Sequence, residues 1–143
     1  MKLVFGTSML LICFVSACNT TGVPTEIANA CNADNEKKTL EVSGYLDART
    51  SVYCSNRAGR MECGFDFLDA PGGTKKFGTD IEQGSGANTV DEIKGSYKKE
   101  ELKIRDNAGN QVAVGTDKVK VTGKMSIEPK MDVCFMQVYK IEK

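Results

Sequence analysis

The stretch that decides the fold spans residues 51–67 and reads SVYCSNRAGRMECGFDF. Apolar and polar residues alternate through its second half, and the apolar set is Met61, Cys63, Phe65 and Phe67. This period of two is typical of a half-buried β-strand. The Arg-Ala-Gly-Arg sequence at 57–60 suits a tight turn, and Val52 and Cys54 share one face before it. The stretch therefore predicts a β-hairpin.

The length of the turn decides the register of this hairpin. A two-residue turn places Cys54 opposite Cys63 and Val52 opposite Phe65. The two cysteines then form a non-hydrogen-bonded pair, where antiparallel strands approach most closely, as a disulfide requires. A three-residue loop would place the two thiols on opposite faces. Because the first register keeps every apolar side chain on one face, we predict a Cys54–Cys63 disulfide.

The first 17 residues predict an export signal. Lys2 supplies a positive charge near the amino terminus, and residues 3–15 are mostly apolar. The 15 residues from 3 to 17 fall short of the roughly 20 that a bilayer-spanning helix needs, so a permanent membrane helix is not expected. Small residues follow the apolar run, as they do at a processing site.

Residues 15–18, VSAC, resemble the lipobox of bacterial lipoproteins: an aliphatic residue, two small residues and a cysteine. Cys13 does not fit this pattern because the bulky Ile12 precedes it. We therefore predict that the mature chain begins at Cys18 and that this cysteine carries the lipid. The alternative is an ordinary signal peptide that is cut after Ala17 and leaves a free thiol.

Lipidation would also decide the location of the protein. Three acyl chains on Cys18 bury enough methylene groups for a permanent anchor. The next residue is Asn19. An Asp at this position favours retention in the inner membrane of enterobacteria, so Asn indicates the outer membrane. We expect a lipid-anchored protein on the periplasmic face of the bacterial outer membrane.

Four cysteines remain once Cys13 is removed and Cys18 is lipidated, and they are Cys31, Cys54, Cys63 and Cys134. An even number in an exported chain predicts two disulfides. Since the hairpin pairs Cys54 with Cys63, Cys31 is left to pair with Cys134. No two cysteines have the CxxC spacing of a metal site, so we expect no metal.

The charged residues of the mature chain nearly balance. Without Lys2 the chain keeps 19 − 1 = 18 Lys and Arg against 19 Asp and Glu, a net charge of about −1. This balance argues against a general polyanion binder, whose affinity depends on clustered positive charge. The chain contains no histidine, which excludes a histidine general base and histidine ligands to zinc. We therefore expect a protein that is not an enzyme and needs no cofactor.

The turn residues divide the mature chain into a polar tether at 18–38 and one β domain at 39–143. We expect a long strand at 39–55 bent at Gly44, a second strand at 60–68, a hairpin within 101–115 that turns at 107–110, and strands at 117–127 and 132–142. Residues 69–96 hold many glycines and predict a loop, with at most a short helical turn at 90–94. The pattern predicts an all-β fold, a small antiparallel barrel of five or six strands.

The last two predicted strands carry a resemblance to a known family. Residues 117–127 read DKVKVTGKMSI, a loop with a proline follows, and residues 134–142 read CFMQVYKIE. This pattern resembles the last two strands of OB-fold domains, and the architecture resembles them from 39 to 142. The chain is most similar to small OB-fold lipoproteins and periplasmic OB-fold proteins of Gram-negative bacteria. No helix is expected after the third strand, where such domains usually have one; a lipocalin-like or other small β-barrel is the rival fold.

The resemblance implies a binding site on the second and third strands and on two loops, which here are SNRAGR at 55–60 and IEPKM at 127–131. The residues it points to are Tyr53 as a stacking platform and Arg57, Arg60 and Lys130 as phosphate-binding cations. The carboxylates expected nearby are Glu62, Asp66, Asp69 and Glu128. Because of these carboxylates we favour the simpler interpretation, in which the hairpin tip binds no ligand and its arginines keep it soluble.

Two functional classes follow from these observations. The first is a non-enzymatic, lipid-anchored binding or adaptor module of the cell envelope, whose partner is an envelope protein or a glycan. The second is an OB-fold lipoprotein that binds nucleic acid. We favour the first, because few cations are available and carboxylates surround them.

Overall fold

The computed structural model describes residues 21–48 and 51–143. The predicted signal sequence and the predicted lipidation site at Cys18 lie outside the described residues. The protein is mostly β: among the described residues, 49% lie in strands and 11% in helices, and two disulfides are present. Within the described ranges, no helix is long and apolar enough to cross a membrane.

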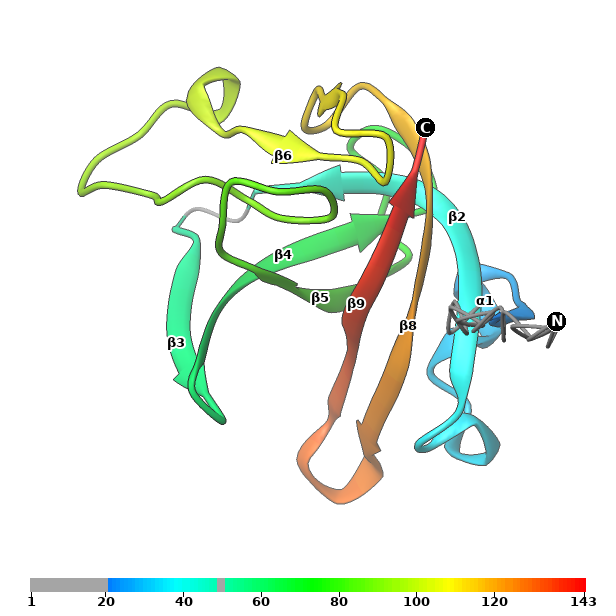
Figure 1. Cartoon of the computed structure of the whole chain (residues 1–143). Coiled ribbons are helices and arrows are strands. Elements are labelled where there is room, and N and C mark those ends of the chain that lie inside the picture. The colour runs from blue at the N-terminus through cyan, green and yellow to red at the C-terminus, as the bar shows by residue number, and fades with distance from the viewer. Residues whose placement is uncertain (1–20, 49–50) are drawn as a thin grey trace, which may run out of the picture.

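Seven strands form the main sheet (Figure 1), and they are β1 (Val23–Pro24), β2 (Thr39–Asp47), β3 (Tyr53–Arg57), β4 (Arg60–Leu68), β5 (Lys76–Glu82), β8 (Lys118–Glu128) and β9 (Val133–Glu142). Their order is β1-β2-β8-β9-β5-β4-β3, and an additional pairing of β2 with β4 closes five of them into a ring. A second sheet consists of β6 (Ile104–Arg105) and β7 (Gln111–Val112). The short helices are α1 (Ile27–Ala30), η1 (Ala33–Asn35), η2 (Lys99–Glu101) and η3 (Pro129–Met131).

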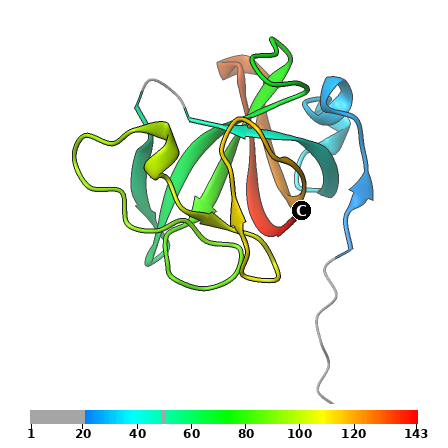
Figure 2. The same cartoon turned by 90° about the horizontal axis from the view of Figure 1, so that it is seen from above.

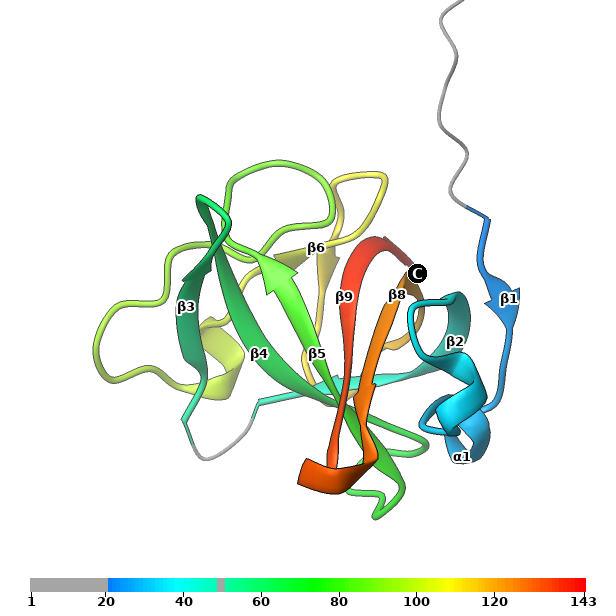
Figure 3. The same cartoon turned by 90° about the horizontal axis from the view of Figure 1, so that it is seen from below.

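The ring has Greek-key connectivity. The strands β2, β4 and β5 follow one another with antiparallel pairing, and β8 returns after a long connection to lie beside β2. Each neighbouring pair in the ring is antiparallel except β5 and β9, which run parallel. In Figure 3 the strands β3, β4, β5, β9 and β8 follow one another across the view.

The hairpin of β3 and β4 has the predicted register. Cys54 pairs with Cys63, and Arg57 pairs with Arg60 across a two-residue turn. The two turn residues, Ala58 and Gly59, both have positive φ, as a type I′ turn requires. The predicted disulfide between the two strands is present.

The long first strand was predicted wrongly, because it is broken in two. Asp47 pairs with Asp66, and the next described pairing joins Tyr53 to Gly64. From the first of these pairings to the second there are two residues along β4, from Asp66 to Gly64, but six along the segment that joins β2 to β3, from Asp47 to Tyr53. The extra residues interrupt the strand, so Val52 lies outside β3 instead of opposite Phe65.

Gly44 marks the place where β2 changes partners. Gly44 pairs with Val119 of β8, while the next residue pairs both with β8 and with Leu68 of β4. A Cβ atom on Gly44 would lie 2.4 Å from the carbonyl oxygen of Leu68 and 2.8 Å from the ring of Phe67. Only a glycine permits this close approach of two backbones.

The strand β5 was missed by the sequence analysis, which expected a loop at 69–96. It pairs with β4 along its whole length and with β9 along one stretch. Its inward side chains are Phe77, Thr79 and Ile81, and the Thr79 hydroxyl donates a hydrogen bond to the Phe65 carbonyl oxygen at 3.1 Å. A buried threonine and an outward Gly78 weaken the apolar alternation, which explains the error. Residues 90–94 form no helical turn.

The connection from β5 to β8 covers one end of the ring (Figure 2). Its apolar side chains Val90, Leu102, Ile104 and Val112 are buried and belong to the same core as the strands. The predicted hairpin within it is formed by β6 and β7. At its turn the carboxylate of Asp106 accepts hydrogen bonds from the backbone N–H groups of Ala108 and Asn110. Burial raises the pKa of Asp106, but these hydrogen bonds outweigh it and hold the pKa below the usual value.

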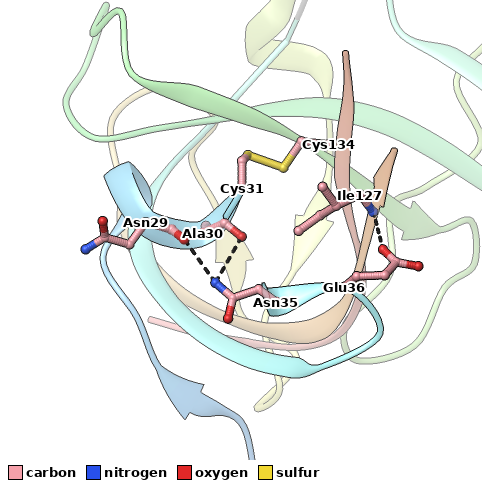
Figure 4. The surroundings of a disulfide bond; sticks show 7 residues. All are labelled: Asn29, Ala30, Cys31, Asn35, Glu36, Ile127 and Cys134. Atoms are coloured by element: carbon pink, nitrogen blue, oxygen red, sulfur yellow. Dashed lines mark hydrogen bonds between the residues drawn. A yellow bond between two sulfur atoms is a disulfide. The ribbon is translucent and has the colours of Figure 1, made fainter. Parts of the chain in front are cut away.

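The segment predicted as a tether at 18–38 belongs largely to the folded domain. Its described part contains β1, α1 and η1, and Ile27 and Ala30 are buried in the core. Figure 4 shows the disulfide from Cys31 to Cys134 at the start of β9, the second predicted pairing. Close by, the Glu36 carboxylate accepts a hydrogen bond from the backbone N–H of Ile127. These contacts tie the segment to the strands, although Ile27 and Ala30 are the only buried residues of its described part.

Candidate ligand-binding face

The outer face of β3, β4, β5 and β9 carries the side chains that alternate with the core residues. We call this surface the groove face, and it consists of Tyr53, Ser55, Arg57, Glu62, Gly64, Gly78, Asp80, Phe135 and Gln137. The inward neighbours of these residues fill the ring; Cys63, Phe65, Ile81 and Met136 are fully buried.

Two glycines form the floor of a first hollow on the groove face. Gly64 pairs with Asp80, and Gly78 pairs with Phe135 of β9, so the two glycines are close neighbours. The hollow measures about 330 Å³ and is lined by Tyr53, Ser55, Arg57, Gly64, Gly78, Asp80, Asp132, Val133, Cys134 and Phe135. A Cβ atom on Gly64 would make only ordinary contacts, at 3.6 Å and beyond. Close packing of the described residues therefore does not require a glycine at this position.

A second hollow of about 370 Å³ adjoins the first. Its lining residues are Glu36, Lys37, Arg57, Glu62, Lys124, Met125, Ser126, Phe135 and Gln137. Arg57 and Phe135 line both hollows, and the Arg57 guanidinium lies over the Phe135 ring at 4.9 Å from its centre. The Arg57 side chain therefore lies between the two hollows.

The charge of Arg57 is offset by two carboxylates. Its Nη1 lies 3.4 Å from Oδ2 of Asp80, and its Nε lies 4.0 Å from Oε2 of Glu62. Glu62 is 4% exposed, and its Oε1 accepts a hydrogen bond of 2.7 Å from the Gln137 amide. Among the described residues, Glu62 Oε2 has no hydrogen-bond donor. At 4.0 Å, the half-exposed guanidinium of Arg57 compensates the charge of this buried carboxylate only weakly.

The structure separates the four ligand-binding residues that the sequence analysis proposed. Tyr53 and Arg57 lie together in the first hollow, and Tyr53 is 77% exposed. Arg60 points elsewhere: it lies 3.8 Å from Glu82 and lines a smaller hollow of about 220 Å³. Lys130 belongs to η3 and is absent from the linings of the two hollows of the groove face.

Of the expected carboxylates, only Glu62 belongs to the groove face. Asp66 pairs with Lys76 at 2.9 Å, and Glu128 accepts a hydrogen bond from the backbone N–H of Lys130 at the start of η3. Asp69 lines a larger hollow, of about 500 Å³, which lies between the N-terminal segment and β2. Three carboxylates, two lysines and no aromatic side chain are found among the described residues that line it, so we do not select it.

Three residues of the groove face were missed by the sequence analysis: Asp80, Phe135 and Gln137. Asp80 lies in the stretch that was expected to be a loop. Phe135 had a signal in the sequence, because the last strand carries apolar residues on both faces and one of those faces lies outside the ring. Among residues 21–48 and 51–143, no cluster of three or more side chains suited to a metal ion is found.

No protein-family model matches this chain, and neither a curated protein nor a solved structure shows a significant match to it.

Proposed function

We propose that this protein is a non-enzymatic binding or adaptor module of the bacterial cell envelope. In this proposal a lipid on Cys18 anchors it in the outer membrane, it faces the periplasm, and it binds its partner through the groove face. The observation that carries the proposal is the first hollow, where Tyr53 is 77% exposed above the glycine floor of Gly64 and Gly78. An exposed aromatic ring beside a hollow and charged groups is typical of a recognition surface.

We further propose that the ring is an OB-fold. Five strands with Greek-key connectivity support this assignment. In OB-folds the ligand lies on the second and third strands between two loops. The matching elements here are β4, β5, the turn at 58–59 and η3, and residues adjoining both the turn and η3 line the first hollow.

The composition of the groove face favours an envelope protein or a glycan over nucleic acid. Arg57 is offset by Asp80 and Glu62, and Arg60 lies beside Glu82. Few phosphates could be neutralised by such a surface, and nucleic-acid affinity grows with that number. Full-length protein in detergent should leave a labelled single-stranded oligonucleotide unbound near physiological salt. Micromolar binding that disappears after Arg57→Ala and Arg60→Ala would favour the nucleic-acid function instead.

The binding proposal is tested by photo-crosslinking in cells. A photoreactive phenylalanine replaces Tyr53 in the full-length protein, and crosslinked envelope partners are identified after irradiation. Gly64→Trp should remove the crosslinks, because the indole fills the first hollow. Gly86→Trp is the matched control, since a Cβ atom there meets no other atom within 4 Å. Equal crosslinking in both variants would contradict binding at this face.

The anchor is tested separately. Cys18→Ser should move the protein from the membrane fraction to the soluble fraction and leave the signal sequence uncut by the lipoprotein peptidase. Unchanged fractionation and unchanged mass would contradict lipidation at this residue.

A further inference from the structure

We propose that the groove face recognises an arginine side chain of a protein partner, and that Arg57 occupies this arginine site in the free protein. The inference rests on the proposed function, because it names the chemistry that the groove face binds. Three observations carry it: the groups around the Arg57 guanidinium, the buried Glu62 oxygen that receives no hydrogen bond beside it, and the exposed position of Arg57.

The groups that surround the Arg57 guanidinium come from three different strands. Phe135 of β9 lies under it at 4.9 Å, Asp80 of β5 lies 3.4 Å away, and Glu62 of β4 lies 4.0 Å away. An aromatic face together with carboxylates is the set of groups that recognises a guanidinium. The protein therefore already holds one guanidinium, its own, on this face.

Glu62 keeps an acceptor that Arg57 does not satisfy. Glu62 is 4% exposed, and its Oε2 receives no hydrogen bond from the described residues while Arg57 stays 4.0 Å away. Asp132 also lines the first hollow, and Arg57 is the single cation among the described residues that line it. A guanidinium placed closer to Glu62 would meet the acceptor that Arg57 does not reach.

Arg57 is placed where it can leave this site. It is the last residue of β3 before the two-residue turn, and its side chain is 48% exposed. Ion pairs of this exposure are weak, so the cost of moving the side chain into solvent is small. Because Arg57 lies between the two hollows, its departure would join them along Phe135 and leave Tyr53 at the rim as a second aromatic surface.

The charge of Arg57 makes the inference testable by the sign of one mutational effect. An arginine ligand competes with Arg57, so removing Arg57 should strengthen its binding. An anionic ligand such as a nucleic acid would use Arg57, so its binding should weaken. A neutral glycan would respond little to the loss of the charge.

The experiment measures fluorescence anisotropy of full-length protein in a neutral detergent with a labelled peptide of alternating glycine and arginine. The same peptide with citrulline in place of arginine is the neutral control. Arg57→Ala should tighten binding of the arginine peptide by about three- to fivefold, because the ion pairs that the Arg57 side chain gives up are weak. Asp80→Asn and Glu62→Gln, which keep the size of each side chain, should weaken it by a similar factor.

Arg60→Ala is the matched control, because Arg60 flanks the same turn and carries the same charge but lines neither hollow. It should change the affinity less than twofold. Arg57→Gln, which keeps the stem of the side chain, replaces Arg57→Ala if the alanine variant does not fold.

Three results would each overturn the arginine site. The first is weaker or unchanged binding of the arginine peptide after Arg57→Ala. The others are equal affinity for the citrulline and arginine peptides, or an equal gain in affinity from Arg60→Ala and Arg57→Ala. The crosslinking experiment separates this failure from failure of the proposed function. Crosslinks that depend on Gly64 would still establish the groove face as a binding surface for a partner of another chemistry.

Discussion

Two charged surfaces on the outside of the ring differ in how tightly their charges are paired. The first is the groove face around Arg57. The second, which we call the charge ladder, consists of Glu41, Lys120, Lys140 and Glu142 on β2, β8 and β9. In the ladder, Lys120 lies 3.5 Å from Glu41 and 3.2 Å from Glu142, and Lys140 lies 2.8 Å from Glu142.

The comparison is sharpest between two glutamates. Glu62 and Glu142 each have one buried oxygen, Oε2, whose charge is offset by an ion pair. The nearest cation to this oxygen is 3.2 Å away in Glu142 and 4.0 Å away in Glu62, among the ion pairs of the described residues. Hydrogen bonds from Lys140 and Lys120 lower the pKa of Glu142, and a hydrogen bond to Glu142 raises the pKa of Lys120.

The strand register explains the difference. The ladder residues lie on strands in continuous pairing, and Lys120 is directly opposite Glu142. Arg57 instead belongs to the end of a hairpin and reaches Glu62 and Asp80 across the surface. Charges placed by a regular sheet pair closely and stabilise the fold. Charges that meet across a hollow pair at longer distances, 3.4 and 4.0 Å here.

The largest effect is expected from the disulfide at the edge of the groove face. Cys31→Ala with Cys134→Ala opens a covalent loop of 103 residues. This should lower the free energy of unfolding by about 4–5 kcal/mol, measured by urea denaturation. Hydrogen exchange should rise more at the start of β9, beside the first hollow, than at its end in the ladder.

The matched control is removal of the hairpin disulfide by Cys54→Ala with Cys63→Ala. This loop has a sequence separation of 9, so the loss should be nearer 3 kcal/mol. Equal losses for the two double variants would argue against the loop-entropy explanation.

A smaller effect is expected from the two glycines that differ in the space around them. Gly44→Ala should destabilise the protein by about 1–3 kcal/mol, because its new methyl group would meet backbone at 2.4 Å. Gly64→Ala on the groove face should change stability by about 0.5 kcal/mol or less, because its new methyl group would make only ordinary van der Waals contacts. Thermal unfolding of both variants measures the contrast, and similar losses would mean that the hollow is filled in solution.

The ladder should make a stabilising contribution that depends on pH. Because the folded-state pKa of Glu142 is below the ordinary value of 4.5, its contribution is present above that value and is lost as the pH falls through the folded pKa. Glu142→Gln should therefore lower the melting temperature at neutral pH and lower it less in acid. Glu92→Gln is the control, because Glu92 forms an exposed ion pair with Lys94. It should change the melting temperature little at either pH. A difference that persists unchanged in acid would contradict the pairing.

The smallest effect on stability is expected at Arg57. Its side chain is half-exposed and its ion pairs are long, so Arg57→Ala should change the free energy of unfolding by less than about 1 kcal/mol. Urea denaturation provides the measurement. A loss of 2 kcal/mol or more would mean that Arg57 is a structural residue of the ring, and the contrast with the ladder would fail.

The hairpin of β3 and β4 could be predicted because all of its determinants are local. A two-residue turn, alternating side chains and two cysteines in matching positions lie within 51–67. The prediction of β8 succeeded for the same reason, since its residues alternate, and β9 was predicted from a local run that is apolar on both faces. The pairing of Cys31 with Cys134 followed by elimination and not from geometry.

The strand β5 could not be predicted from its own residues. Thr79 occupies a core position because its hydroxyl finds the Phe65 carbonyl oxygen on β4, and Gly78 faces outward beneath Phe135. The buried threonine and the outward glycine both depend on residues of β4 and β9 that are distant in the chain. The interruption between β2 and β3 also depends on β4, whose register leaves no space for a continuous strand opposite it.

Half of the candidate site was accessible from the sequence. Tyr53 and Arg57 were named because the resemblance to OB-fold domains points to the predicted hairpin at 51–67. Asp80, Phe135 and Gln137 join them only because β5 and β9 pair in parallel and bring residues 78–80 beside residues 135–137. No local pattern contains that pairing.

The sequence by itself determined the strands with strict alternation, the tight turn at 58–59 and the set of cysteines available for disulfides, because each depends on residues a few positions apart. The tertiary structure alone decided that β5 completes the ring, that residues 23–35 belong to the domain, and that Arg57 lies among Phe135, Asp80 and Glu62. These features depend on contacts between distant segments, whose side chains acquire their surroundings only after the ring has closed.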